Sequence, residues 1–270
     1  MPQSPQNPAF QPARPLKLPR TARTVTALIL REMSTTYGRS ALGYLWAVLE
    51  PAAGIMLLTF IFSLAFRSPE LGTNYPLFFA SGMLPFMVFQ DISQKTSVAL
   101  RFSRALLFYP GVTFIDALLA RIILNVMTQI MVSAIVLCGI LQFYQVDVLI
   151  DAPSIALGYA MAISLGIGIG TLNCFLLSLY PIWERTWAIL TRPLFIISTV
   201  LFLFDSVPLP YRDWLWYNPL IHAVAATRQG IYATYDANFV SPTYTFAIAA
   251  ITLMAGLLML RKYNKKIINI

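Results

Sequence analysis

Hydrophobic residues gather in six long runs along the chain. The runs cover residues 43–66, 76–98, 121–144, 154–180, 187–205 and 243–260. A helix needs about 20 mainly apolar residues to cross a bilayer. Residues 51–66 alone would span only about 24 Å as a helix, so we expect the first span to begin near Gly43. The pattern predicts an all-α membrane protein with six transmembrane helices, and it places Glu50 inside the first of them.

A different pattern precedes the first run. Residues 1–21 are rich in proline and poor in apolar side chains, so we predict a disordered tail there. Within 22–38, apolar residues recur at three- and four-residue steps opposite a face that holds Arg23 and Arg31. This pattern is typical of an amphipathic helix that lies along the membrane surface. The alternative is an amphipathic helix that packs on a soluble partner.

One further apolar segment, 219–235, is too short for a span and contains His222 and Arg228. A crossing there would also move the basic C-terminal residues to the opposite side of the membrane. We therefore predict that 208–217 and 219–235 form a re-entrant pair of short elements between spans 5 and 6. Their Trp and Tyr residues suit the depth of the membrane interface.

Composition and charge set the class and the orientation. The chain is 58% hydrophobic and only 11% charged, whereas charged residues make up about a quarter of a soluble domain. An even number of spans puts both termini on one side, and 16 of the 19 Lys and Arg residues belong to that side. The positive-inside rule predicts that both termini are cytoplasmic, including a basic tail at 263–270.

The ionisable residues do not form the pattern of an enzyme. The sequence has one histidine and no acidic pair within a span, no metal-ligand spacing and no Gly-x-Ser-x-Gly motif. It also lacks the phosphate-binding loop Gly-x-x-x-x-Gly-Lys. We expect no catalysis, metal or cofactor in this chain, so any ATP must be bound by another polypeptide. Cys138 and Cys174 fall within spans, where we expect them to pack as small residues.

Two charges lie within predicted spans, Glu50 in the first and Arg192 in the fifth, and each precedes a proline. A lone charge in a span costs at least about 2.5 kcal/mol. Pairing with each other, or exposure to a wet cavity, would reduce this cost. The alternative is that each side chain reaches the headgroups independently. Together with Tyr44 and Trp46, these residues are our candidates for a substrate path.

Small residues follow a four-residue repeat in the fourth span. The positions are Gly158, Ala162, Gly166, Gly170, Cys174 and Ser178. A ridge of small side chains allows another helix to approach closely. We expect this ridge to run along one face and to pack within the subunit, with a subunit interface or a moving seam as the alternative.

The loop between the second and third spans, 91–121, carries the apolar cluster 105–109 beside Arg101 and Arg104. Exposed apolar clusters rimmed by charge usually contact a protein. We therefore expect a cytoplasmic partner to cover this cluster. The alternative is that the cluster lies on the bilayer surface.

Five short motifs give a resemblance to a known family, and they are LRE (30–32), LGYLWAVLEP (42–51), LPF (84–86), RPL (192–194) and WYNPL (216–220). From about Val25 to Lys262, the chain closely resembles the membrane permease of capsular polysaccharide ABC exporters, of the type-2 ABC exporter class. The resemblance implies a homodimer that binds two cytoplasmic ATPase subunits, which hold ATP and Mg²⁺. It also implies export of lipid-linked capsular polysaccharide across the bacterial inner membrane.

The same resemblance implies roles for individual segments. It identifies 22–38 as the interface helix, 208–235 as a periplasmic re-entrant feature and the 104–116 region as the coupling element. The candidate coupling residues are Arg104, Leu106, Leu107, Phe108, Tyr109 and Asp116. A periplasmic export protein is a further candidate partner, and no nucleic-acid partner is expected.

Two other functions remain open at this point. One is export of O-antigen or teichoic acid chains by a transporter of the same class. The other is a membrane-embedded glycan transferase or polymerase, which should show clustered acidic or histidine residues at one membrane face. The sequence shows no such cluster, so it favours the exporter.

Overall fold

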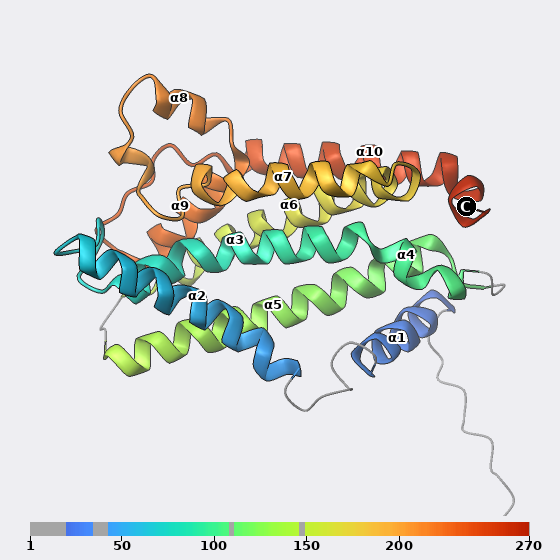
Figure 1. Ribbon diagram of the computed structural model, residues 1–270, viewed down its shortest axis with the longest axis horizontal. Coiled ribbons are helices and arrows are strands. Elements are labelled where there is room, and N and C mark those ends of the chain that lie inside the picture. Colours follow the sequence, from blue (N-terminus) through green and yellow to red (C-terminus); the bar gives the residue numbers. More distant parts are fainter. Residues whose placement is uncertain (1–19, 35–42, 108–110, 146–148, 270) are drawn as a thin grey trace, which may run out of the picture.

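The computed structural model describes residues 20–34, 43–107, 111–145 and 149–269, and every regular element in these ranges is a helix. The long helices lie roughly side by side along the longest axis of the molecule (Figure 1). Helices α1 and α4 and the C-terminus lie at one end of the molecule, and α8 lies at the other. We call these the α4 end and the α8 end.

Six helices correspond to the six predicted spans, and they are α2 (Gly43–Ala65), α3 (Tyr75–Ser97), α5 (Phe114–Tyr144), α6 (Ala152–Leu179), α7 (Ile182–Ile197) and α10 (Pro242–Asn269). The shorter elements are α1 (Arg20–Glu32), α4 (Ala99–Ser103), η2 (Arg104–Leu106), η3 (Phe204–Ser206), α8 (Tyr211–Trp216) and α9 (Pro219–Ile231). The boundaries of α2, α3 and α6 agree closely with the predicted ones.

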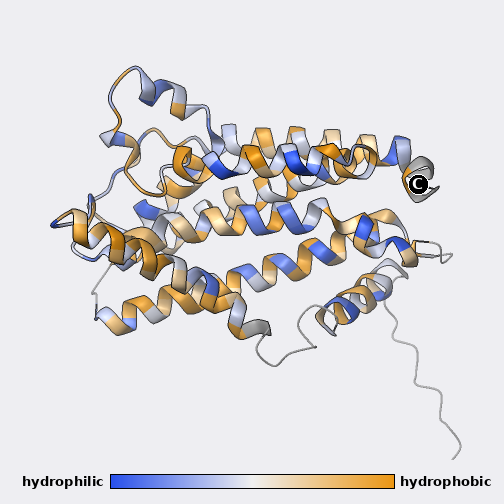
Figure 2. Ribbon diagram, viewed as in Figure 1, coloured by the Kyte–Doolittle hydropathy of each residue, from blue (hydrophilic) through white to orange (hydrophobic). Residues whose placement is uncertain are grey.

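Four of the helices, α2, α5, α6 and α10, are long and apolar enough to cross a membrane. Helix α3 is as long as α2, but its second half is polar, with seven polar residues in the segment QDISQKTS that ends at Ser97. Figure 2 shows this as hydrophilic patches along α3, in contrast to the mainly hydrophobic α2 and α10. Helix α7 has only 16 residues, or about 24 Å of helix.

Helix α5 begins at Phe114, seven residues before the predicted start of the third span at 121. Thr113 and Asp116 form a capping box at this start. The Asp116 carboxylate accepts hydrogen bonds from the backbone N–H and the hydroxyl of Thr113, at 2.9 and 2.8 Å. In return, the Thr113 hydroxyl accepts from the Asp116 N–H at 3.2 Å. The Thr-x-x-Asp spacing is a sequence signal for a helix start that hydrophobicity alone did not reveal.

The fifth span is predicted over 187–205, whereas the helix in this region, α7, covers Ile182–Ile197. Thr199 has a φ of 57°, in the left-handed region that a β-branched residue rarely adopts. The carbonyl groups of Thr199, Val200 and Phe202 accept hydrogen bonds from Arg228 of α9 instead of from helical N–H groups. A contact between residues far apart in the sequence therefore ends the helix.

The predicted basic tail at 263–270 is helical in the structure as far as Asn269, because α10 continues to that residue. Leu260 and Ile267 lie two turns apart on this helix, and both are buried in one apolar cluster with Phe175 of α6. The ring of Tyr263 lies between them in sequence and packs 5.6 Å from the ring of Phe175. Because one face of α10 stays apolar and buried, the helix extends beyond the part that is hydrophobic on all sides.

Helix α6 is at the centre of the molecule and packs against α3, α9 and α10. Its glycines allow close backbone contact on several sides. A Cβ at Gly158 would lie 2.8 Å from the carbonyl oxygen of Ala223 in α9, and a Cβ at Gly170 would lie 2.9 Å from that of Ser93 in α3. Gly168 faces α10, where a Cβ would lie 2.4 Å from the Ala249 oxygen. Contact distances this short leave no room for a side chain.

The prediction that the small residues share one face of this helix is wrong. With 3.6 residues per turn, each four-residue step rotates the position by about 40°. Gly158 therefore faces α9, while Gly166 and Gly170 face α3, where their nearest neighbours are Ile92, Phe89, Thr96 and Ser93. All of these contacts lie within the subunit.

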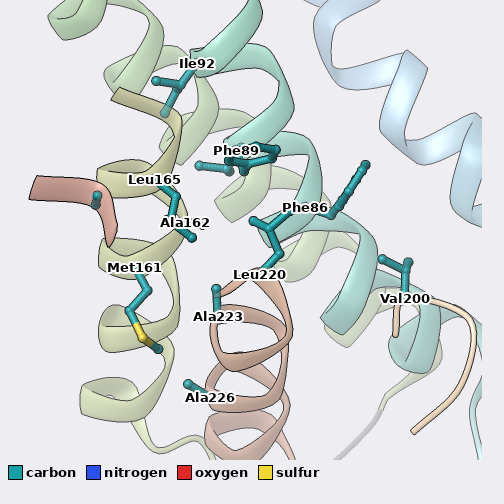
Figure 3. Packing of buried hydrophobic residues seen from close by; sticks show 12 residues of the cluster. Phe86, Phe89, Ile92, Met161, Ala162, Leu165, Val200, Leu220, Ala223 and Ala226 are labelled. Carbon is teal, nitrogen blue, oxygen red and sulfur yellow. The ribbon is translucent and has the colours of Figure 1, made fainter. Parts of the chain in front are cut away.

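The largest apolar cluster joins three of these helices (Figure 3). Phe86, Phe89 and Ile92 come from α3, and Met161, Ala162 and Leu165 come from α6. Leu220, Ala223 and Ala226 of α9 complete the cluster toward the α8 end. Ala162, the remaining predicted packing residue, is fully buried here. This cluster holds α3, α6 and α9 together as one body.

Helix α1 spans Arg20–Glu32, while residues 35–38 of the predicted segment lie outside the described ranges. Its apolar residues Val25 and Leu28 are buried against Ala120 of α5, together with Leu106 and Val112. The apolar face predicted to lie on the membrane surface thus packs against the protein's own chain.

Candidate functional site: polar cavities and the coupling segment

A cavity of about 340 Å³ lies between α3 and α7; we call it the α3–α7 cavity. Helix α3 contributes four polar residues at helical spacing: Gln90, Ser93, Gln94 and Ser97. Helix α7 contributes a matching stripe: Glu184, Trp187, Ala188, Thr191 and Arg192. Positions three and four apart share one face of a helix. Polar side chains of the two helices therefore face each other across this space, beside apolar ones such as Phe86 and Phe89.

A second cavity, of about 230 Å³, lies between α2, α3 and α5. Glu50 and Trp46 of α2 line it, opposite Asp91 and Lys95 of α3 and Gln129 of α5. Lys95 and Asp91 form an ion pair at 3.4 Å, and the Gln129 amide donates a hydrogen bond to the same carboxylate. The Glu50 carboxylate therefore faces a polar environment.

Glu50 and Arg192 line different cavities, and within the described chain no salt bridge joins them. We expected pairing or exposure to a wet cavity to reduce the cost of inserting these charges. In the structure, each of the two residues lines a cavity that also contains polar side chains. Trp46 lines the same cavity as Glu50. The side chain of Tyr44 lies outside the described part of the structure.

The segment expected to couple to a partner has two kinds of residue. Leu106 packs against α1 and Leu107 against the apolar cluster of α4, α5 and α6, so both are partly buried by their own chain. Arg104 is exposed. Phe108 and Tyr109 lie outside the described residues. The protein itself therefore covers part of this apolar cluster, and Asp116 is buried in the capping box that starts α5.

A buried ion pair connects α1 with α5 at the same end. The Nε atom of Arg121 lies 3.1 Å from a carboxylate oxygen of Glu32, and both side chains are about nine-tenths buried. The guanidinium group of Arg121 also lies over the ring of Phe102 in α4, 4.3 Å from its centre. Burial raises the pKa of Glu32, although the nearby Arg121 acts to lower it. Helices α1, α4 and α5 thus meet at one residue, Arg121.

Helix α9 contains the two polar residues that argued against a seventh span, and both are buried. The His222 Nδ1 atom accepts a hydrogen bond from the Ser241 N–H at 3.3 Å, and its Nε2 atom lies 3.1 Å from the Trp216 carbonyl oxygen. Burial lowers the pKa of His222. Two partners and a neutral ring mark His222 as a structural residue.

Arg228 is 1% exposed and donates three hydrogen bonds of 2.8 Å to backbone carbonyls. The carbonyls belong to Thr199, Val200 and Phe202, in the segment after α7. The ring of Phe78 packs against the guanidinium group at 4.6 Å. Sequence reasoning used Arg228 only as evidence against a span. Its partners are carbonyl groups that become free where α7 ends. Because the position of that end depends on tertiary structure, the sequence alone does not reveal them.

These features define a class: a helical membrane protein with polar cavities between its helices, as a membrane transporter needs. Comparison with known proteins gives the family. Residues 23–232 match the family model of the ABC-2 type transporter. The chain is 31% identical to the polysialic acid transport protein KpsM of Escherichia coli over 238 residues, which cover 88% of this chain and 92% of KpsM.

Two further relatives are similar over almost the same length. The capsule polysaccharide export inner-membrane protein CtrC of Neisseria meningitidis is 23% identical over 247 residues, covering 90% of this chain and 92% of CtrC. BexB of Haemophilus influenzae, which carries the same description, is 22% identical over 247 residues with the same coverage. The chain belongs to the ABC-2 type transporter family. It is the inner-membrane permease component, which is not the catalytic subunit, and such a permease implies an ATPase partner.

Proposed function

We propose that this chain is the permease of an exporter that moves capsular polysaccharide, attached to a lipid, out across the bacterial inner membrane. The observation that carries the proposal is identity at the 31% level across 88% of the chain with a polysialic acid transport protein. The capsule export descriptions of CtrC and BexB support the same substrate class. Polar cavities beside Glu50 and Arg192 suit a hydroxyl-rich chain, since each offers donors and acceptors within a hydrophobic protein.

The proposed topology has six crossings, with α3 and α7 as the second and fifth spans, and both termini in the cytoplasm. Helix α3 packs closely against α6, including at Gly166 and Gly170. This packing supports a position of α3 inside the bilayer. The α8–α9 pair enters and returns from the periplasmic side. Cysteine labelling after Lys266 tests this topology, and labelling from the periplasmic side would reject it.

The proposed assembly contains a second copy of the chain and two ATPase subunits, which bind ATP and Mg²⁺. Helix α2 supports the second copy, because its apolar side chains Leu45, Met56, Phe60 and Leu64 are exposed in the single chain. A periplasmic export protein is a further proposed partner. Tyr44, Trp46, Glu50 and Arg192 remain the proposed substrate-path residues.

The 104–116 region remains the proposed contact for the ATPase. Arg104→Glu is the sharper test, because Arg104 is exposed, whereas Leu106 and Leu107 also support the fold of this chain. We expect this charge reversal, and separately Phe108→Asp, to reduce co-purification of the ATPase and surface polysaccharide at least about tenfold. Removal of a well-placed charged contact at an interface has an effect of this size.

Arg67→Glu is the matched control, since Arg67 is an exposed arginine that follows the C-terminal end of α2. It should leave ATPase binding unchanged. Normal ATPase recovery and export in both test variants would place the coupling contact elsewhere.

The substrate class has its own test. Deletion of the gene should trap polysaccharide inside the cell, and the full-length chain should restore it to the surface. Trapped O-antigen or teichoic acid in place of capsule would identify the other exporter type. Loss of polymer synthesis with no trapped polymer would instead favour a membrane-embedded transferase or polymerase.

A further inference from the structure

The α3–α7 cavity contains a buried polar atom with no partner. Ser93 is 2% exposed, lines the cavity, and its Oγ atom has no hydrogen-bond partner. A buried hydroxyl without a partner costs about 1 to 3 kcal/mol. Arg192 lines the same cavity, and no described salt bridge neutralises it. A cavity lined by an unsatisfied hydroxyl and by a cation with no salt bridge in the described chain, beside apolar residues such as Phe86, is suited to an anionic, hydroxyl-rich ligand.

Helix α7, which forms one wall of this cavity, is held mainly at its two ends. None of its residues is buried. At the α4 end, the Trp183 indole donates to the Asn173 side chain at 2.9 Å, and Glu184 pairs with Arg101 of α4 at 2.8 Å. Near its C-terminal end, Leu194 and Phe195 pack against the large apolar cluster, and the centres of the Phe195 and Phe86 rings lie 5.3 Å apart.

At the other end, Arg228 binds the three carbonyls that follow α7. We call this set of bonds the Arg228 clamp. The bonds to Thr199 and Val200 are buried and the bond to Phe202 is partly buried, so water competes little with them.

The two ends differ in how easily they open. The Arg101 and Glu184 side chains are 48% and 58% exposed, and exposed ion pairs contribute little to stability. Glu184 lines the α3–α7 cavity, and Arg101 belongs to α4, which ends directly before the proposed coupling segment at Arg104. The weak end of α7 is therefore the one that touches α4, directly before the coupling segment.

We propose that the α3–α7 cavity binds a segment of an anionic, hydroxyl-rich chain, and that the Arg101–Glu184 ion pair closes its α4 end. Arg192 attracts the anionic groups, while Gln90, Ser93, Gln94 and Thr191 bind hydroxyls. When movement of α4 separates Arg101 from Glu184, α7 turns away from α3 about the Arg228 clamp, and the cavity opens. The choice of ligand rests on the proposed function; the cavity and its closure do not.

Water access to the cavity is tested first, in the full permease in inside-out membrane vesicles. In a Cys138→Ser background, Ala188→Cys places a thiol in the cavity and Leu190→Cys places one on an exposed apolar position outside the lining. A charged, membrane-impermeant thiol reagent should modify the first at least about tenfold faster, because thiolates form in water and not in lipid. Equal rates at the two positions would show that the cavity is not a water-filled site.

Closure is tested by adding Glu184→Gln, which removes the ion pair. Labelling of the cysteine at 188 should then become about 1.5-fold to 5-fold faster, which is the range that an exposed ion pair contributes to an equilibrium. Arg185→Gln is the matched control, because Arg185 is exposed but does not line the cavity. No change with Glu184→Gln, or the same change with Arg185→Gln, would overturn the role of this ion pair.

The ligand is tested by protection of the same cysteine. A sialic acid hexamer is the anionic probe and maltohexaose the neutral one. The anionic probe should slow labelling at least about threefold, the neutral probe should slow it less, and Arg192→Gln should remove the difference between them. Protection by neither probe would overturn the ligand, and equal protection by both would overturn the role of Arg192.

The outcomes also separate this inference from the proposed function. If deletion of the gene leaves surface polysaccharide unchanged while the probe protects the cysteine, the proposed function fails and the cavity remains a binding site. If export depends on the chain but the probe gives no protection, the substrate path lies elsewhere, and the cavity beside Glu50 is the next position to test.

Discussion

Helices α6 and α7 follow each other in the chain and are both hydrophobic, yet they are held in different ways. Helix α6 contacts α3, α9 and α10 along its length, through glycines that bring backbones together. Helix α7 buries none of its residues, and polar interactions anchor its two ends. A helix fixed by close backbone contact can move only with its neighbours. A helix fixed at its ends can rotate about the stronger one once the weaker one opens.

The largest effect is expected at the strong end of α7. Arg228→Met removes three hydrogen bonds and leaves three carbonyl groups without their donor. At about 1 kcal/mol or more for each stranded group, we expect a loss of roughly 4 kcal/mol of stability. The measurement is the apparent unfolding midpoint of the purified protein in detergent, at a fixed scan rate.

Arg212→Gln, on α8, is the control for loss of an arginine near this end of the molecule. Arg228→Lys keeps the charge but cannot donate to three carbonyls in the same fork geometry, so it should be nearly as damaging as Met. An unchanged midpoint in Arg228→Met would show that α7 is not anchored there.

The next effect concerns the central helix. Gly170→Leu places a Cβ 2.8 Å from the Cβ of Thr96 and 2.9 Å from the carbonyl oxygen of Ser93. Helices α3 and α6 would have to separate, so we expect a loss of roughly 3 kcal/mol and a large drop in folded yield. Gly139→Leu is the matched control, because a Cβ there has nothing within 4 Å. Equal yields of the two variants would mean that α6 is not fixed by close contact.

The smallest effect is expected at the weak end of α7. Trp183→Phe keeps an aromatic ring but removes the hydrogen bond to the buried Asn173 side chain. The loss should be about 1 kcal/mol, detected as a small decrease of the unfolding midpoint. Trp214→Phe is the control, since Trp214 is 80% exposed. A loss as large as that of Arg228→Met would contradict the difference between the two ends.

The sequence determined the helices that depend on local composition. The starts and ends of α2, α3 and α6 agree with the prediction within about two residues, because a long apolar run bounded by polar and proline residues specifies a helix with no help from distant contacts. The family was also recognisable from short motifs, and the family model confirms it over 23–232. The start of α5 was equally readable, from the capping box of Thr113 and Asp116.

Only the tertiary structure decided the features that depend on residues far apart in the chain. The end of α7 is set by Arg228, which follows Thr199 by 29 positions. Leu106 packs partly against α1, and Glu50 and Arg192 line separate cavities. Hydrophobicity is a property of each segment, so it reports which segments avoid water. It contains no information on which segments meet, and in this protein the meeting of α9 with the segment after α7 decides where α7 stops.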